Sequence, residues 1–157
     1  MRSVSKLTAL LCCFLALTSL AAIAATYCDV SGANVAFGTY DPLGPARRDT
    51  IGTISVTCTG SIGDRVNYSL LLDPGQNGVY GVMTNDAYEL YYIIYSDNGY
   101  TQIWGDGTAG TGVVSDSYTM ATSRTSRTYP IYGRISAGQK RAKSGTYSAS
   151  VRITLTY

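Results

Sequence analysis

Apolar and polar residues alternate along several short segments of the chain, and this period of two is the pattern of strands that bury one face. The alternation is clear over 54–58 and 66–72. The segment 88–95 carries apolar residues on both faces, one of them formed by Tyr88, Leu90, Tyr92 and Ile94. Weaker strand candidates are 34–38, 113–120 and 128–135, where Pro130 predicts an edge or a bulge because it lacks an N–H. The clearest run is 146–157, where one face holds Tyr147, Ala149, Val151, Ile153, Leu155 and Tyr157.

Turn signals such as Asp73-Pro74-Gly75 separate these segments and leave no room for a long helix. The composition agrees, because 14 Tyr and 17 Gly with Glu89 as the only Glu favour strands and turns over helices. We therefore predict an all-β fold, an antiparallel β-sandwich of the immunoglobulin type with six to seven strands.

The N-terminus has the features of an export signal. Arg2 and Lys6 precede an apolar run over 7–20, and Ala22-Ile23-Ala24 offers small residues to a signal peptidase. The apolar run is shorter than the roughly 20 residues that span a bilayer, and no further span follows. We predict a secretory signal peptide over 1–24, a mature domain over 25–157, and no transmembrane segment after cleavage.

Two cysteines, Cys28 and Cys58, remain in that mature chain. Thiols are oxidised in exported proteins, so we expect one disulfide between them, the alternative being two unpaired buried thiols. Two thiolates without a histidine or an acidic cluster do not complete a zinc site. We therefore expect no metal and no other cofactor.

Charge and composition exclude several functions. The net charge of +2 is carried by Arg2 and Lys6, so the mature chain is balanced and has no basic surface for nucleic acid. The sequence has no histidine, the commonest general base, and a single glutamate. We therefore do not expect an enzyme.

Several motifs occur in a fixed order along the mature chain. After Cys28 come Phe37-Gly38-Thr39-Tyr40-Asp41-Pro42-Leu43, Ile54-Ser55-Val56-Thr57-Cys58, Leu90-Tyr91-Tyr92-Ile93-Ile94-Tyr95-Ser96-Asp97, Trp104-Gly105-Asp106-Gly107-Thr108, Tyr132-Gly133-Arg134-Ile135 with Gln139, and the terminal Gly145-Thr146-Tyr147 strand. This ordered set resembles the spore coat protein U domain family, which includes subunits of archaic (Csu-type) chaperone-usher pili.

The resemblance implies an incomplete immunoglobulin-like sandwich that lacks its final strand. A periplasmic chaperone would hold such a subunit, an outer-membrane usher would assemble it, and a neighbouring pilus subunit would donate the missing strand. Location then runs from the bacterial periplasm to the cell surface, and the fibre serves adhesion or biofilm formation.

The last strand, which ends at Tyr157, supplies a physical argument for the acceptor half of this exchange, because it has no following segment to pair with. We expect the acceptor groove to be lined by Phe37, Val151, Ile153, Leu155 and Tyr157. Cleavage before Ala25 leaves three residues ahead of Cys28, which span about 10 Å and are too short to replace a strand. The chain would thus accept a strand without donating one, as at a fibre end or tip.

The alternative is a self-complete secreted sandwich that acts as a spore or cell coat component or as a carbohydrate-binding module. Aromatic side chains would then form its binding surface, because their rings stack on sugars. The candidates are Tyr91, Tyr95, Tyr100 and Trp104.

Overall fold

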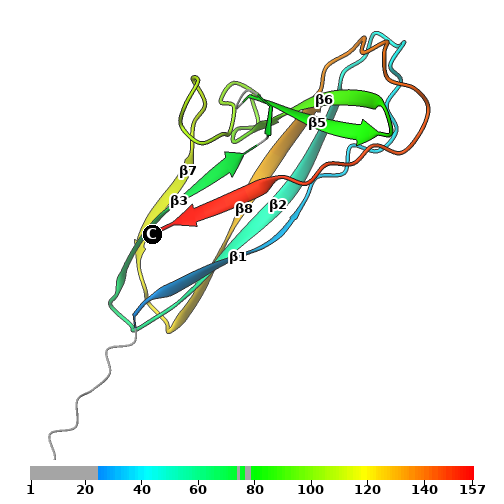
Figure 1. The fold of residues 1–157 in the computed structure, drawn as a ribbon. Helices are drawn as coiled ribbons and strands as arrows, with labels where there is room; N and C mark the ends of the chain where they lie inside the picture. Colours follow the sequence, from blue (N-terminus) through cyan, green and yellow to red (C-terminus); the bar gives the residue numbers. More distant parts are fainter. Residues whose placement is uncertain (1–24, 74, 77–78) are drawn as a thin grey trace, which may run out of the picture.

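The structure, a computed structural model, describes residues 25–73, 75–76 and 79–157, and the predicted signal peptide over 1–24 lies outside this range. The described part of the chain contains nine strands and no helix. Figure 1 shows how the strands are arranged. They are β1 (Tyr27–Asn34), β2 (Arg48–Thr59), β3 (Arg65–Asp73), β4 (Gly75–Gln76), β5 (Tyr80–Asn85), β6 (Tyr88–Tyr95), β7 (Val114–Thr119), β8 (Arg124–Ile135) and β9 (Arg152–Thr156).

The strands form two sheets that pack face to face. One sheet has six strands in the order β1-β2-β8-β6-β5-β4, and the other has three in the order β7-β3-β9. All strand pairs are antiparallel. This arrangement confirms the all-β, immunoglobulin-like sandwich, with β4 and β5 in addition to the strands expected from the sequence.

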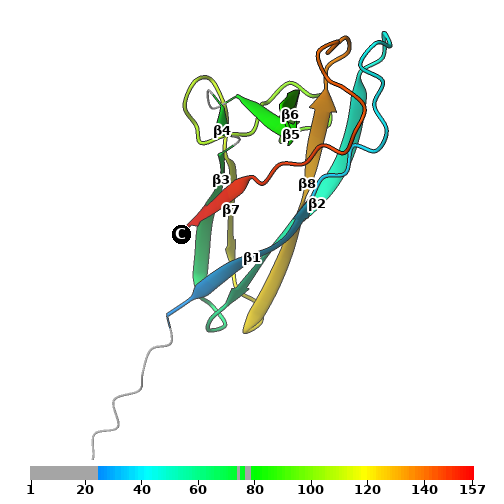
Figure 2. The same ribbon diagram turned by 45° about the vertical axis from the view of Figure 1, so that its right-hand side comes forward.

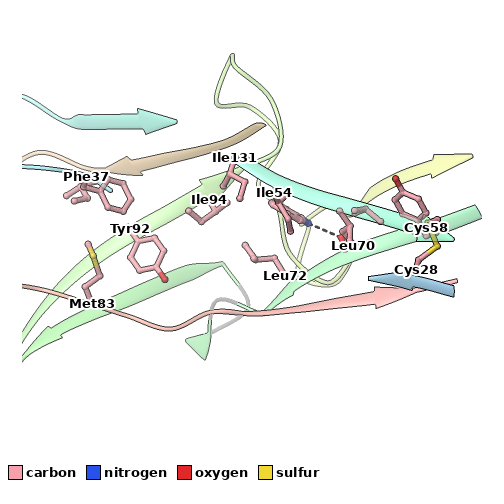
Figure 3. Close-up of a cluster of buried hydrophobic side chains, with 14 of the residues drawn as sticks. Cys28, Phe37, Ile54, Cys58, Leu70, Leu72, Met83, Tyr92, Ile94 and Ile131 are labelled. Carbon is pink, nitrogen blue, oxygen red and sulfur yellow. Dashed lines mark hydrogen bonds between the residues drawn. A yellow bond between two sulfur atoms is a disulfide. The ribbon is translucent and has the colours of Figure 1, made fainter. Parts of the chain in front are cut away.

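Alternate residues of β2 and β3 supply the centre of the core, as their sequence pattern predicted (Figure 3). Each of these side chains is at most 3% exposed: Ile54, Val56, Cys58, Val66, Tyr68, Leu70 and Leu72. Trp104 joins them from a loop, and its indole Nε1 donates a hydrogen bond to the carbonyl of Leu70 at 2.9 Å. An alternating strand thus buries one full face, and the loop aromatic is drawn in because its only polar atom finds a partner there.

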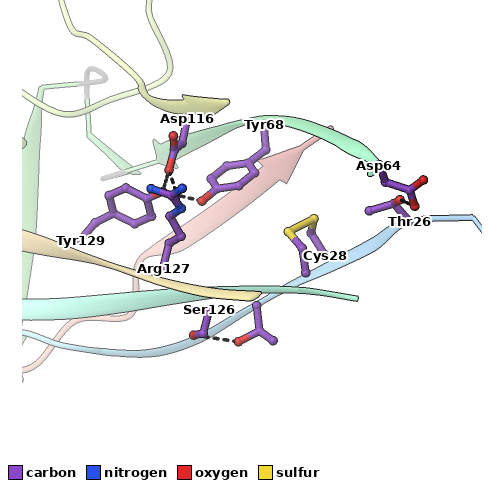
Figure 4. The surroundings of a disulfide bond; sticks show 10 residues. Thr26, Cys28, Asp64, Tyr68, Asp116, Ser126, Arg127 and Tyr129 are labelled. Carbon is purple, nitrogen blue, oxygen red and sulfur yellow. Dashed lines mark hydrogen bonds and ion pairs between the residues drawn. A yellow bond between two sulfur atoms is a disulfide. The ribbon is translucent and has the colours of Figure 1, made fainter. Parts of the chain in front are cut away.

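The disulfide links Cys28 and Cys58, as expected from the sequence. The two residues lie directly opposite each other in the register of β1 and β2 (Figure 4), and both are buried. The bond therefore ties the edge strand β1 to the interior of the six-stranded sheet.

Two strand predictions were wrong in their bounds. The first strand was expected over 34–38, but β1 covers Tyr27–Asn34 and residues 35–40 form no strand. The last strand was expected over 146–157, but β9 starts only at Arg152. The residues before it cross from one sheet to the other, because Ser148 pairs with Thr84 of β5 whereas β9 pairs with β3. Alternation reports which way side chains face and carries no information about a strand that changes sheets.

Pro130 lies in β8, which is an interior strand of its sheet. At Pro130 itself, however, β8 pairs only with β2, because its pairing with β6 is confined to Tyr132–Arg134. The missing N–H of the proline is therefore tolerated at a place that is locally an edge.

One side of the sandwich is closed by polar side chains that join the two sheets (Figure 4). The Tyr129 hydroxyl of β8 donates to the Asp116 carboxylate of β7 and is hydrogen-bonded to the Tyr68 hydroxyl of β3. Arg127 lies 3.5 Å from the same carboxylate and 4.4 Å from the ring centre of Tyr118. The bond to Tyr129 lowers the pKa of Asp116, while burial raises the pKa of Tyr129. These groups fix the β7–β8 side of the sandwich.

Candidate functional site

The opposite side of the sandwich is open, and a groove of about 800 Å³ runs into it. Its floor is the apolar core itself, and Figure 3 shows Phe37, Tyr92 and Met83 gathered at one end of this cluster. The groove lies between residues 34–42 on one wall and 142–153 on the other. Its floor consists of Leu72, Met83, Leu90, Tyr92, Ile94, Ile131 and Ile135.

The first wall follows β1 but leaves the ladder of the sheet. Its carbonyls accept hydrogen bonds from side chains of β2 instead, Ala36 from the Thr50 hydroxyl at 2.7 Å and Phe37 from Arg48 Nε at 2.6 Å. Phe37 lies over Gly133 of β8, where a Cβ atom would come within 2.8 Å of the phenylalanine ring. The absence of a side chain at position 133 therefore lets this wall pack closely on the sheet.

The second wall is the segment that leads into β9. The Tyr147 hydroxyl accepts from the Lys143 N–H at 2.9 Å and donates to the Lys143 carbonyl at 3.0 Å. Ser148 and Thr84 exchange two main-chain hydrogen bonds, at 3.0 and 3.3 Å. These bonds hold the wall at Lys143, Tyr147 and Ser148, and Ala142 at its start is buried.

Beyond the end of the groove, β1 and β9 flank the same open side. Figure 2 shows both strands there, β1 in blue and β9 in red. Within the described residues β1 pairs only with β2, and β9 only with β3. Their Cα atoms approach within 8 Å. A strand hydrogen-bonded to both would hold them about 9.4–9.8 Å apart, two ladder spacings. An added strand thus fits most readily at the groove, and β1 and β9 would separate slightly to admit it along their full length.

Three of the five residues predicted for this groove line it, and two do not. Phe37, Val151 and Ile153 line it. Leu155 packs against the core outside the groove. Tyr157 is 60% exposed and does not belong to the lining. The floor residues of β5 and β6 were not predicted to line the groove, although the alternation over 88–95 places Leu90, Tyr92 and Ile94 on one face. Only the strand order of the sheet, which local alternation does not reveal, brings that face under the open side.

The aromatic residues proposed as a binding surface differ in exposure, and only some of them reach the surface. Trp104 is 1% exposed, so its assignment to a surface site was wrong, because the indole completes the core. Tyr95 is 8% exposed beneath Tyr100. Tyr91 does reach the surface, and its hydroxyl donates to Glu89, a bond that raises the pKa of this tyrosine.

Other kinds of site find little support in the described residues. No group of three or more histidine, cysteine, aspartate or glutamate side chains in them is arranged to hold a metal ion. In the same part of the chain, no helix has the length and apolar character needed to cross a membrane. The groove is larger than a second hollow of about 430 Å³ beside Asn67, Ser115 and Thr156, and its floor is apolar.

Comparison with known proteins adds an identification that agrees with this architecture. No curated protein matches the chain. The family model of the Spore Coat Protein U domain matches residues 14–154, nearly the whole sequence. The chain therefore belongs to the Spore Coat Protein U domain family.

Proposed function

We propose that this protein is a secreted structural subunit of a surface fibre of the archaic chaperone-usher type, and that its groove accepts a strand donated by a neighbouring subunit. The observation that carries this proposal is the apolar groove on the open side of the sandwich. The mature domain is residues 25–157, and its role is structural rather than catalytic.

The chemistry of the groove suits a strand better than a small molecule. Both β1 and β9 have main-chain groups without a ladder partner along the open side, and an added strand satisfies such groups by β-augmentation. Alternate side chains of the added strand would enter the groove between Met83 and Tyr92 of the floor and Ile153 of the second wall. Before assembly a periplasmic chaperone would protect this apolar surface. At an outer-membrane usher, the strand of a neighbouring subunit would replace the chaperone. The assembled fibre would serve adhesion or biofilm formation.

The N-terminal residues support a role at a fibre end or tip. Thr26 Oγ1 donates to Asp64 Oδ2 at 2.7 Å, and the residues after it belong to β1, which the disulfide anchors. Cleavage of the signal before Ala25 would therefore leave no free N-terminal strand to donate. Mass spectrometry of the exported protein tests this part, because a mature N-terminus well before Ala25 would supply a donor segment.

Thermal unfolding of the exported protein, refolded with and without synthetic strands from candidate neighbouring subunits, tests the acceptor role. We expect a strand to produce or raise a cooperative transition. The variant Ile153→Thr, which places a hydroxyl in the groove, should weaken this effect. Ile62→Thr is the matched control, because Ile62 is 73% exposed and lies outside the groove. A free monomer that melts cooperatively and does not respond to any strand or chaperone would contradict the proposal.

A further inference from the structure

The outward face of the six-stranded sheet has two unlike halves. One half carries small polar side chains in rows across β1, β2 and β8: Ser31, Ser55 and Thr128 in one row, and Asp29, Thr57 and Ser126 in the next. The other half carries large ones, with Ile51, Tyr132 and Tyr95 in register across β2, β8 and β6. Exposed sheet faces are usually polar, so the second half needs an explanation.

Tyr100 completes this second half from the loop after β6. Its ring lies over the guanidinium of Arg134, with 3.8 Å between the Arg134 Cζ atom and the ring centre. Its edges contact Tyr95 and Tyr132, with ring centres 5.4 and 5.9 Å apart. We call Tyr95, Tyr100, Tyr132 and Arg134 the aromatic platform; Ile51 and Tyr80, which are 65% and 47% exposed, lie on neighbouring strands at its sides.

The backbone of Tyr100 is held in a conformation that a bulky residue seldom adopts, with φ at +56°. Asp97 enforces it. The Asp97 carboxylate accepts hydrogen bonds from Gln102 N at 2.7 Å and from the N–H and hydroxyl of Thr101, both at 2.9 Å, and the Asp97 carbonyl accepts from Tyr100 N at 3.2 Å. Such strain, maintained by several bonds, is commonly found where a side chain is positioned for a ligand.

The charges of the aromatic platform are already neutralised. Arg134 makes two hydrogen bonds to the Asp49 carboxylate, Nε to Oδ1 at 2.7 Å and the second nitrogen to Oδ2 at 2.8 Å. Tyr100 covers the face of the same guanidinium. Arg134 is therefore not free to bind an anion. The surface favours an uncharged ligand that has both apolar surfaces and hydroxyl groups.

The size of the platform distinguishes between the candidate ligands. Three to four strands at about 4.8 Å and two outward positions along each span roughly 200 Å² of sheet. The exposed part is smaller, because Tyr95 is buried and Tyr100 and Tyr132 are half-buried. A stable protein partner covers about 800 Å² on each side. The area is suited to a few rings of a chain molecule.

We propose that the aromatic platform binds a neutral polysaccharide, with a sugar ring stacked on Tyr100, the hydroxyls of Tyr100 and Tyr132 at its edges, and Tyr95 supporting Tyr100 from beneath. Tyrosine suits this ligand because it combines a flat apolar ring with a hydroxyl that donates and accepts hydrogen bonds. This site lies on the outward face of the sheet and is independent of the groove, so it neither requires nor excludes strand exchange.

Calorimetric titration of the exported protein with cellohexaose, maltohexaose and an acidic oligogalacturonate tests the proposal. We expect at least one neutral hexasaccharide to bind, and Tyr100→Asn to weaken that binding by about tenfold or more. Asparagine tolerates a positive φ, so this variant removes the ring while retaining the loop conformation. Tyr157→Asn is the matched control, because Tyr157 is 60% exposed and lies outside the platform.

Circular dichroism melts of both variants establish that they are folded. The proposal is overturned if neither neutral saccharide binds the wild type, if Tyr100→Asn binds as the wild type does, or if only the acidic saccharide binds. Self-association that Tyr100→Asn abolishes would assign the platform to a second copy of the chain and would also overturn it.

Discussion

The variant Tyr129→Phe removes the hydroxyl that joins the two sheets at the closed side of the sandwich. In the wild type this hydroxyl donates its only hydrogen to Asp116, so Tyr68 must be the donor in the bond between the two tyrosines. The variant thus leaves Asp116 without its main hydrogen-bond donor and Tyr68, which is 3% exposed, without its acceptor.

The size of the loss follows from these two bonds. A hydrogen bond to a charged group contributes about 1.5–3 kcal/mol, and a buried hydroxyl without a partner costs about 1–3 kcal/mol. Asp116 retains the N–H of Ser117, and its side chain is 21% exposed, so water replaces part of the lost bond. We expect the free energy of unfolding to fall by about 2–4 kcal/mol at neutral pH.

Urea unfolding with the disulfide intact measures this loss, and Tyr68→Phe is the control. That variant removes the bond between the tyrosines but retains the bond to Asp116, so it should cost only about 0.5–1.5 kcal/mol. An equal cost for the two variants would show that Asp116 gains nothing from Tyr129.

The pH dependence provides a second, independent check. The bond from Tyr129 is the main cause that lowers the folded-state pKa of Asp116 below 3.8. Its stabilisation is therefore fully present above pH 3.8 and is lost as the pH falls through the folded-state pKa. The difference between the wild type and Tyr129→Phe should shrink in this acid range, and a difference that stays constant from neutral to acid pH would refute the reasoning.

Three further predictions concern β1 and the first wall of the groove. Replacing Cys28 and Cys58 by serine should lower the free energy of unfolding in urea by about 3.6 kcal/mol, from the entropy of a 30-residue loop, and no loss relative to the oxidised protein would contradict this. Arg48→Met removes the 2.6 Å bond to the Phe37 carbonyl and should increase amide hydrogen exchange over 35–40, whereas unchanged exchange would show that the wall is held by other contacts. Gly133→Val should displace Phe37, cost about 1–3 kcal/mol by overpacking and weaken strand capture, and wild-type stability would argue against this close contact.

Much of the fold could be predicted from alternation alone. In β2 and β3 a period of two specifies which side chains turn inward, because successive residues of a strand point to opposite faces. The structure buries those residues: Ile54, Val56 and Leu70 are fully buried, and Leu72 is 3% exposed. The disulfide was also predictable, because Cys28 and Cys58 are the only two cysteines after the predicted signal peptide.

The candidate sites were harder to predict, because each depends on which strands are neighbours. Leu90 and Tyr92 were recognised as one face of a strand, but only the order of the sheet brings that face under the open side. Trp104 was wrongly placed at the surface, because nothing in the local sequence reveals that the Leu70 carbonyl accepts a hydrogen bond from the indole.

The sequence by itself determined the class of fold, the inward faces of the long strands and the cysteine pair, because these depend on local periodicity and on residue type. Only the tertiary structure decided which edges lack a partner, where the groove runs and which tyrosines meet Arg134. These features depend on contacts between residues far apart in the chain, such as Tyr129 with Asp116 and Phe37 with Gly133. Periodicity gives the direction of a side chain but not its neighbour.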